Sequence, residues 1–331
     1  TLFRSTSFGV ASTANKDGAL AVGSHSTSSV KAGTAMGYNA SVSYSGAGDS
    51  WGATAIGAQT SVTGKNAVAI GRASKASGNN SLAIGAGNND DGTASTDFAE
   101  STGTNSLAIG YNAKAKNISA VAVGKGAKAE GVASTALGET ALADHDNDSA
   151  LGNSVHASGG GSSAVGYLVT TSGNQAFGAG SNTTVSGTAA VGIGYMNTVS
   201  GERAIGIGAD NNGTNNTASG NYSIAIGAAS QATNTNSTAV GTNSNATGED
   251  SFAGASGKAS GAASIAIGKS ANAGGTTAAA SSIAIGDNAA ASGVASTAVG
   301  KKALADKDND SSFGNTSHAS GGGSSAIGYL V

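Results

Sequence analysis

Short runs that alternate apolar with small residues, each closed by a glycine, recur along the chain. NSLAIG stands at residues 80–85 and again at 105–110, and SIAIG stands at 223–227, 264–268 and 282–286. Side chains of a strand point alternately to opposite faces, so this alternation predicts short β-strands. Enrichment in valine, isoleucine and threonine agrees with that prediction.

The closing glycine returns with a fixed period. From Gly110 to Gly208 it recurs every 14 residues, and the same step links most of the other phrases. A second glycine often follows seven residues later, as at Gly78 and Gly131. At roughly 3.3 Å per strand residue, such a repeat holds two strands of about five residues and two turns. We expect the glycines to supply the turn conformations, and helix is disfavoured because each glycine would cost about 1 kcal/mol.

Repeats of this kind stack, because one coil alone cannot bury a face. The sequence therefore predicts an all-β fold: a parallel β-roll, or solenoid, of 14-residue coils over residues 1–331 as a single repetitive domain. Residues 119–169 and 281–331 match at an offset of 162, which indicates an internal duplication. Where the period breaks, we expect surface loops. These insertions lie near residues 38–56, 86–109, 209–226 and 269–285.

The first strand of each coil is uncharged on both faces. Leu82 and Ile84 share one face, and Ser81 and Ala83 share the other. A strand without charge on either face is typical of one covered on both sides. The pattern does not decide which set faces the interior of the roll.

The second strand differs, since Ala127 and Ala129 alternate with Lys128 and Glu130, as in a half-buried strand. It can cover only one face of the first strand. The other would be an apolar stripe far larger than the few hundred Å² that monomers expose, and another copy of the chain is the simplest cover. We therefore expect a homo-oligomer packed through the first strands. The residues predicted to form this core or trimer contact are Leu82, Ile84, Leu107, Ile109, Val121, Val123, Ile224, Ile226, Ile265, Ile267, Ile283 and Ile285.

Composition removes several classes of function. The chain has 54 glycines and no cysteine, so it has neither a disulfide framework nor a thiolate metal site. With 16 Lys and Arg and a net charge of −3, it lacks the electrostatic footprint of a nucleic-acid-binding protein. The triple glycine at 159–161 is not followed by Lys-Ser/Thr, so it is not a phosphate loop. No cofactor is predicted.

The repeated phrase, NSLAIG followed by x-x-A-x-A-x-G-x-x-S, resembles the head repeats of trimeric autotransporter adhesins, the YadA-like head. The resemblance covers essentially all 331 residues. It implies a left-handed parallel β-roll with three identical chains side by side. It also implies display on a Gram-negative outer membrane, on a coiled-coil stalk and a C-terminal membrane anchor that lie outside this chain. Such heads bind host extracellular matrix proteins or cell surfaces, or one another in autoaggregation.

Aromatic residues in two insertions are candidate contacts for a ligand. Tyr44 and Trp51 lie in the first insertion and Phe98 in the second. Aromatic side chains on protruding loops are suitable contact anchors. The alternative is that they pack over the base of each loop.

Two acidic stretches repeat the same spacing. DHDND at 144–148 and DKDND at 306–310 alternate aspartates like the start of a calcium loop, but Ser149 and Ser311 stand where that loop needs glycine. A solvated acidic turn fits the sequence better. The weak metal candidates are Asp144, Asp146, Asp148, Asp306, Asp308 and Asp310.

The histidines give no catalytic pattern. His156 and His318 are duplicates within HASGGG, which indicates a structural place in a turn. No Ser/His/Asp constellation can be argued from spacing, so the chain is not predicted to be an enzyme.

Two other functions compete with adhesion. Ice binding needs Thr-x-Thr at one place in coil after coil, and the sequence reads as scattered threonine. A carbohydrate-active solenoid needs clustered carboxylates and aromatics, which an aromatic content of 4% disfavours.

Overall fold

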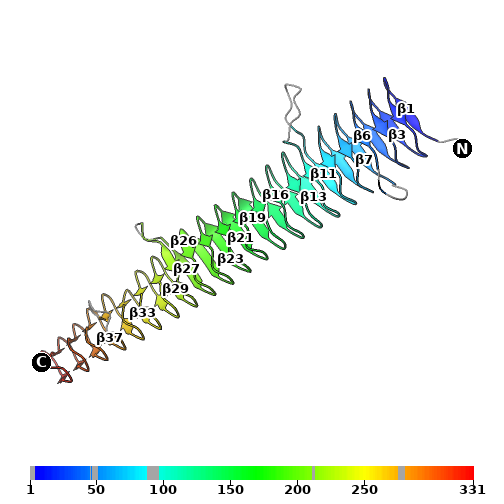
Figure 1. Cartoon of the computed structure of the whole chain (residues 1–331). Coiled ribbons are helices and arrows are strands. Elements are labelled where there is room, and N and C mark those ends of the chain that lie inside the picture. Colours follow the sequence, from blue (N-terminus) through cyan, green and yellow to red (C-terminus); the bar gives the residue numbers. More distant parts are fainter. Residues whose placement is uncertain (1–3, 45, 47–50, 88–96, 211–212, 275–279) are drawn as a thin grey trace. The chain divides into compact units, whose positions relative to one another are not determined.

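The computed structural model describes residues 4–44, 46, 51–87, 97–210, 213–274 and 280–331. The chain divides into two compact units, residues 1–168 and 169–331. In both units each coil contributes a first and a second strand, and the strands pair in parallel with the equivalent strands of the neighbouring coils (Figure 1). The predicted all-β solenoid of 14-residue coils is therefore confirmed. Left-handed winding and assembly into a trimer stay predictions.

In unit 1 the odd-numbered strands are the first strands of the coils and the even-numbered strands are the second. The first strands are β1 (Thr6–Phe8), β3 (Leu20–Val22), β5 (Thr34–Met36), β7 (Thr54–Ile56), β9 (Val68–Ile70), β11 (Leu82–Ile84), β13 (Leu107–Ile109), β15 (Val121–Val123), β17 (Thr135–Leu137), β19 (Ser149–Asn153) and β21 (Ser163–Tyr167). The second strands are β2 (Thr13–Ala14), β4 (Thr27–Ser28), β6 (Ser41–Val42), β8 (Ser61–Val62), β10 (Lys75–Ala76), β12 (Glu100–Ser101), β14 (Lys114–Ala115), β16 (Lys128–Ala129), β18 (Leu142–Ala143) and β20 (His156–Ala157).

Unit 2 follows the same alternation. Its first strands are β23 (Phe177–Ser181), β25 (Val191–Tyr195), β27 (Ile205–Ala209), β29 (Ile224–Ile226), β31 (Thr238–Val240), β33 (Phe252–Gly254), β35 (Ile265–Ile267), β37 (Ile283–Ile285), β39 (Thr297–Val299), β41 (Ser311–Phe313) and β43 (Ser325–Ile327). Its second strands are β22 (Thr170–Thr171), β24 (Thr184–Val185), β26 (Asn197–Val199), β28 (Asn216–Ala218), β30 (Gln231–Ala232), β32 (Asn245–Ala246), β34 (Lys258–Ala259), β36 (Asn272–Ala273), β38 (Ala290–Ala291), β40 (Leu304–Ala305) and β42 (His318–Ala319).

The strands pair motif on motif, including across the insertions. Leu82 pairs with Val68 on one side and with Leu107 on the other, although the second step spans an insertion. Asn197 likewise pairs with Asn216. Each insertion thus falls between strands and leaves the ladder in register. The expected loops themselves lie partly outside the described residues, at 45, 47–50, 88–96, 211–212 and 275–279.

The strands are shorter than the five residues expected from the period. Most first strands have three residues and most second strands have two, while β19, β21, β23, β25 and β27 have five. The turns take up the difference, because non-glycine residues such as Ala73 (φ 61°) and Asn80 (φ 54°) adopt the left-handed conformation two residues after the glycine. That conformation ends the extended backbone.

The two glycines of the repeat have different roles, which corrects the sequence-based prediction. The glycine closing the first strand has a positive φ, as at Gly71 (108°). Gly78, the half-period glycine, has no positive φ, but a Cβ there would lie 1.9 Å from the carbonyl oxygen of Gly103 in the next coil. The half-period glycine therefore permits the close approach of coils, not an unusual turn.

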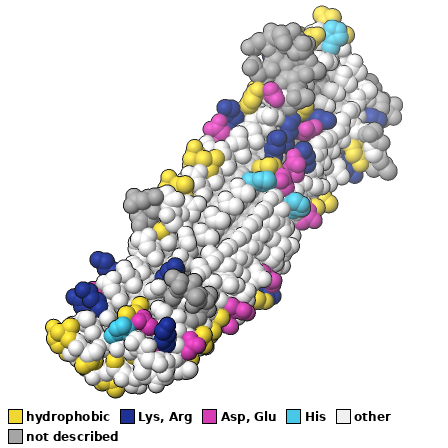
Figure 2. Space-filling model, turned by 60° about the vertical axis from the view of Figure 1, so that its left-hand side comes forward, with side chains coloured by type: hydrophobic (Ala, Val, Ile, Leu, Met, Phe, Trp, Pro, Cys, Tyr) yellow, Lys and Arg dark blue, Asp and Glu magenta, His cyan; other side chains and the backbone are white. Residues whose placement is uncertain are grey.

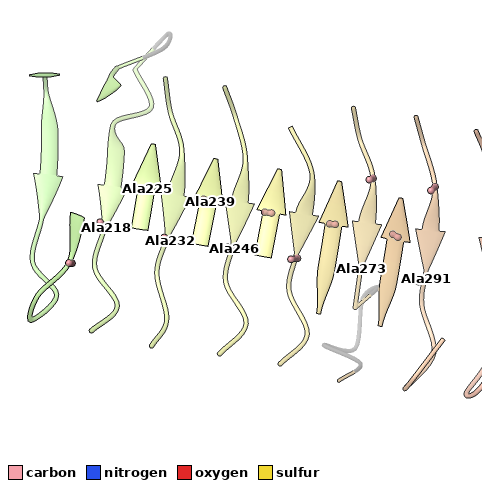
Figure 3. Close-up of a cluster of buried hydrophobic side chains, with 14 of the residues drawn as sticks. Ala218, Ala225, Ala232, Ala239, Ala246, Ala273 and Ala291 are labelled. Carbon is pink, nitrogen blue, oxygen red and sulfur yellow. The ribbon is translucent and has the colours of Figure 1, made fainter. Parts of the chain in front are cut away.

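Small side chains fill the interior of each unit. Ser81 and Ala83 point inward and are buried, as are Ala127 and Ala129 of the second strands. Figure 3 shows the same arrangement in unit 2, where alanines of both strand sets line the interior. The leucine and isoleucine set of the first strands therefore faces outward, which decides the question that the alternation left open. The described residues include no helix of the length and apolarity needed to cross a bilayer.

Candidate functional site

The outer face of the first strands is apolar in both units. Every residue predicted for the core or trimer contact lies on this face, half-buried or exposed. Ile226, Ile267 and Ile285 keep 36–38% of their surface exposed in the single chain. Because these side chains recur in coil after coil, they form an apolar strip along each unit, broken at Gly254 in unit 2 and flanked by threonine or serine in several coils, which we call the first-strand face.

The two aromatic candidates of the first insertion, Trp51 and Tyr44, differ in how much of their surface is exposed. Trp51 is 55% exposed and pairs through its backbone with Lys31, whose Nζ lies 5.1 Å from the centre of the indole ring. Tyr44 instead packs against the buried core of unit 1, and the Nζ of Lys65 lies 5.7 Å from its ring. Tyr44 is therefore partly buried, while more than half of the Trp51 surface is exposed to solvent.

Phe98 lies at the end of the second insertion, in a cluster with Lys75, Glu100 and Lys114. The Nζ of Lys114 lies 4.1 Å from its ring centre. Glu100 on β12 forms ion pairs with Lys75 (3.3 Å) and Lys114 (3.4 Å), on the strands to either side. Burial lowers the pKa of Lys114, and the neighbouring Glu100 carboxylate opposes that effect. Of the two alternatives for Phe98, packing over the base of the loop therefore fits these contacts better than a contact with a ligand.

The insertion is tied to the next coil by a second contact. The Tyr111 hydroxyl donates a hydrogen bond of 3.0 Å to Asp97. This hydrogen bond, with smaller contributions from burial and from the Asp97 charge, raises the pKa of Tyr111.

The first acidic stretch is a hydrogen-bonded connector between neighbouring coils. Asp148 is 0% exposed and accepts hydrogen bonds from Ser162 N (2.8 Å), Ser162 Oγ (2.9 Å) and His145 N (3.0 Å). Asp146 accepts a hydrogen bond from the backbone N–H of Val132 in the preceding coil. Asp144 lies 2.6 Å from His156 Nε2. The three carboxylates thus serve three different partners and do not converge on one point.

The second copy repeats these contacts. Asp310 accepts hydrogen bonds from Ser324 and from Lys307 N, and Asp306 lies 2.6 Å from His318 Nε2. Burial by itself raises the pKa of Asp310, but hydrogen bonds from Ser324, Lys307 and Gly322 outweigh it and lower the pKa below its usual value. Among the described residues, no group of three or more His, Asp or Glu side chains is placed to hold a metal ion.

The triple glycine completes this connector. Gly322 (φ 76°) and Gly323 (φ 68°) adopt the left-handed conformation in succession, as do Gly160 and Gly161 in the first copy. Consecutive left-handed residues strongly favour glycine. They bring the turn over the carboxylate of the preceding coil, as the hydrogen bond from Gly322 to Asp310 shows.

Two sequence-based predictions are corrected by this arrangement. Asp148 and Asp310 are buried and are not part of a solvated turn. His156 and His318 lie on strands β20 and β42 and not in turns. The sequence carried a usable signal, since an aspartate and a serine 14 residues later are duplicated together, at 148 and 162 and at 310 and 324.

The outer face of the second strands differs between one stretch of unit 1 and one stretch of unit 2. In unit 1, Lys75, Glu100, Lys114 and Lys128 follow one another on β10, β12, β14 and β16. In unit 2, the equivalent positions on β22, β24, β26 and β28 are all threonine: Thr170, Thr184, Thr198 and Thr217. The prediction of scattered threonine is therefore wrong for this stretch, and the 14-residue spacing of the first three was the signal. Figure 2 shows that charged side chains gather in some areas of the surface and are absent from others.

Comparison with known families agrees with this architecture. The model of the YadA head domain repeat matches residues 3–26, 52–74, 63–88, 101–127, 129–154, 212–230, 232–253, 278–303 and 305–330. No curated protein matches the chain. The matched segments cover more than half of the sequence and occur in both units. The chain therefore belongs to the YadA-like head family, the heads of trimeric autotransporter adhesins.

Proposed function

We propose that this chain assembles as a homotrimer into an adhesive head that binds host extracellular matrix proteins or cell surfaces, or other heads in autoaggregation. The observation that carries the proposal is the first-strand face. It is apolar along each unit, while the second-strand face of the same coils is polar or charged. Monomeric proteins rarely expose an apolar patch of more than a few hundred Å². Two further copies of the chain cover this strip.

Trimerisation also provides the mechanism of adhesion. Three copies of each weak contact raise the avidity without any new interaction. Trp51 is the aromatic candidate with the most accessible ring, whereas Tyr44 and Phe98 contribute mainly as rigid supports. The head acts at the surface of a Gram-negative outer membrane, anchored by a C-terminal region outside this chain. Neither an enzymatic role nor a cofactor is part of the proposal.

Sedimentation of the purified chain, followed by a binding screen, tests the proposal. We expect a trimer at micromolar concentration, and binding to at least one of collagen, fibronectin, laminin and cultured host cells, or self-association. A well-folded monomer that stays monomeric would contradict it. The variant Thr184→Asp, on the second-strand face, is a matched control that should remain trimeric.

A second candidate function rests on the threonine row of unit 2. Thr170, Thr184 and Thr198 stand in register on adjacent strands, about 4.8 Å apart, and form a regular row with one threonine per coil in place of the Thr-x-Thr pair. Thermal hysteresis that is abolished in the Thr184→Lys, Thr198→Lys variant would favour ice binding. Absence of hysteresis in the unmodified chain would exclude it.

A further inference from the structure

The half-period turns of the first coils in unit 1 form an edge rich in cationic side chains. The backbone N–H groups of Gly18, Ala32 and Gly52 donate hydrogen bonds to the carbonyl oxygens of Arg4, Asp17 and Lys31, respectively. Each bond joins a turn to the equivalent turn of the preceding coil, so the turns stack one on the next. The described residues of this edge include Arg4, Lys16, Lys31, Trp51 and Lys65, with Asp17 as the acidic member. Among the described residues of this edge, four cationic side chains stand against one carboxylate, in a chain whose net charge is −3.

Aromatic rings lie between the lysines of this edge. Lys31 lies over Trp51, and Lys65 lies over Tyr44, at 5.1 and 5.7 Å. Lys31, the pair of aromatic residues and Lys65 come from three successive coils. The order along the edge is therefore ammonium, aromatic rings, ammonium.

The aromatic pair combines a fixed and an accessible ring. Tyr44 packs on the core of unit 1, so its position is set by the fold. Trp51 is more than half exposed, and its backbone is fixed by pairing with Lys31. Rigid aromatic anchors lose little conformational entropy when a ligand binds. The edge therefore offers a preorganised contact surface.

We propose that this edge, formed in unit 1 by the described residues Arg4, Lys16, Lys31, Tyr44, Trp51 and Lys65, binds acidic polysaccharides. This inference deepens the adhesive function proposed above and rests on it. The aromatic rings stack on the apolar C–H faces of sugar rings, and the ammonium and guanidinium groups pair with sulfate or carboxylate groups. A linear polyanion can follow the edge, because successive coils repeat about every 4.8 Å and present their cations in a row. A protein ligand does not require that regular spacing of like charges.

The single tryptophan of the chain provides a direct measurement. Purified full-length chain is titrated with a heparin oligosaccharide, with hyaluronan and with neutral dextran, and Trp51 emission is followed. We expect a saturable change with heparin that weakens by about tenfold or more between roughly 0.05 and 0.2 M salt, and no change with dextran. Binding of hyaluronan as well indicates that carboxylates suffice, and binding of heparin alone indicates that sulfate is needed. No saturable change with either polyanion overturns the proposal.

Variants separate a built site from general charge attraction. Lys31→Ala with Lys65→Ala should weaken heparin binding by about tenfold or more, and Trp51→Ala, followed by surface plasmon resonance, by about fivefold or more. The control Lys301→Ala with Lys302→Ala removes the same charge from exposed positions in unit 2 and should change affinity less than twofold. An equal loss in the control would contradict the proposal. Tighter binding of single-stranded DNA than of heparin would overturn it as well.

The same variants keep this inference distinct from the proposed function. Substitution of any of the five positions, Lys31, Trp51, Lys65, Lys301 and Lys302, should leave the melting temperature and the trimer unchanged. If the chain is a trimer and adheres to matrix proteins or cells but ignores heparin, the polysaccharide site fails and the adhesive head stands. If the chain is a monomer without any adhesion, the proposed function itself fails.

Discussion

The inner and outer positions of the coil obey different rules. Away from the terminal coils, inner positions are mostly alanine or serine and are buried, in unit 1 as in unit 2. Outer positions range from isoleucine on the first strands to lysine, glutamate or threonine on the second. The interior of a two-strand coil is too thin for large side chains, so packing limits its composition. The outer faces have no such limit, and their chemistry reflects what each face contacts.

One stretch of unit 2 satisfies the packing rule in another way. Val185 and Val199 occupy inner positions of the second strands, where most coils have alanine. Opposite them stand Gly192 and Gly206 in place of alanine, and a Cβ on Gly192 would lie 2.4 Å from Val185. The volume of each pair is roughly conserved, although it is divided unequally between the two strands and not equally as in a pair of alanines. This exchange is particular to the stretch, since Val42 and Val62 of unit 1 are buried beside first strands that keep alanine.

The largest loss of stability is expected for substitutions on the first-strand face, which the proposed trimer would bury. Replacement of both Ile84 and Ile109 by aspartate should destabilise the proposed trimer by about 3 kcal/mol or more per site, because each would leave an uncompensated charge in the proposed contact between copies. Thermal melts and sedimentation measure the loss. An unchanged melting curve and an unchanged trimer would show that the first-strand face is not covered.

The packing limit at the inner positions can be tested at the pair of Val185 and Gly192. Gly192→Ala should cost about 1–3 kcal/mol, because the new methyl group overpacks against Val185. Val185→Ala in the same chain recreates the alanine pair of ordinary coils and should recover much of that loss. A double-mutant cycle from chemical denaturation gives the coupling energy. Additive effects of the two changes would contradict the packing argument.

The buried carboxylate of Asp310 makes the stability of the chain depend on pH. The pKa of Asp310 is lower in the folded chain than its unfolded value of about 3.9, so it contributes stability above that pH and loses this contribution as the pH falls through the folded pKa. We expect the melting temperature to fall in this acid range, and Asp310→Asn to reduce that pH dependence while lowering stability at neutral pH. Melts of both proteins from neutral pH to about pH 2 measure it. Identical pH profiles would exclude the role of Asp310.

The smallest effect is expected on the outer face of the second strands. Thr184→Ala and Lys128→Ala should each change the free energy of unfolding by less than about 0.5 kcal/mol, because both side chains are exposed and neither packs on the interior. Chemical denaturation provides the comparison with the Gly192 variant. A loss as large as that of an inner substitution would remove the distinction between the two kinds of position.

The candidate site could be predicted from the sequence only in part. The tryptophan of the first insertion was found because it is unique, but its lysine neighbours come from other coils and are separated from it in sequence. The same is true of Asp148, whose donors include a serine one coil away. From the sequence alone, the acidic stretch at 144–148 therefore resembled a solvated turn. The threonines of β22, β24, β26 and β28 resembled scattered residues, because only the stacking of the coils places them side by side.

The sequence by itself determined the period, the parallel coils and the small residues that alternate along each strand, since a 14-residue repeat closed by glycine admits few other folds. It did not determine which uncharged face of the first strand lies inside, because alanine and isoleucine can both be buried. Only the tertiary structure decided this, since the narrow gap between the strands of one coil mostly holds alanine and serine, in places valine, and the leucine and isoleucine side chains of the first strands lie outside it. It also decided which residues meet across coils, because contacts one or more coils apart depend on the stacking and not on local sequence.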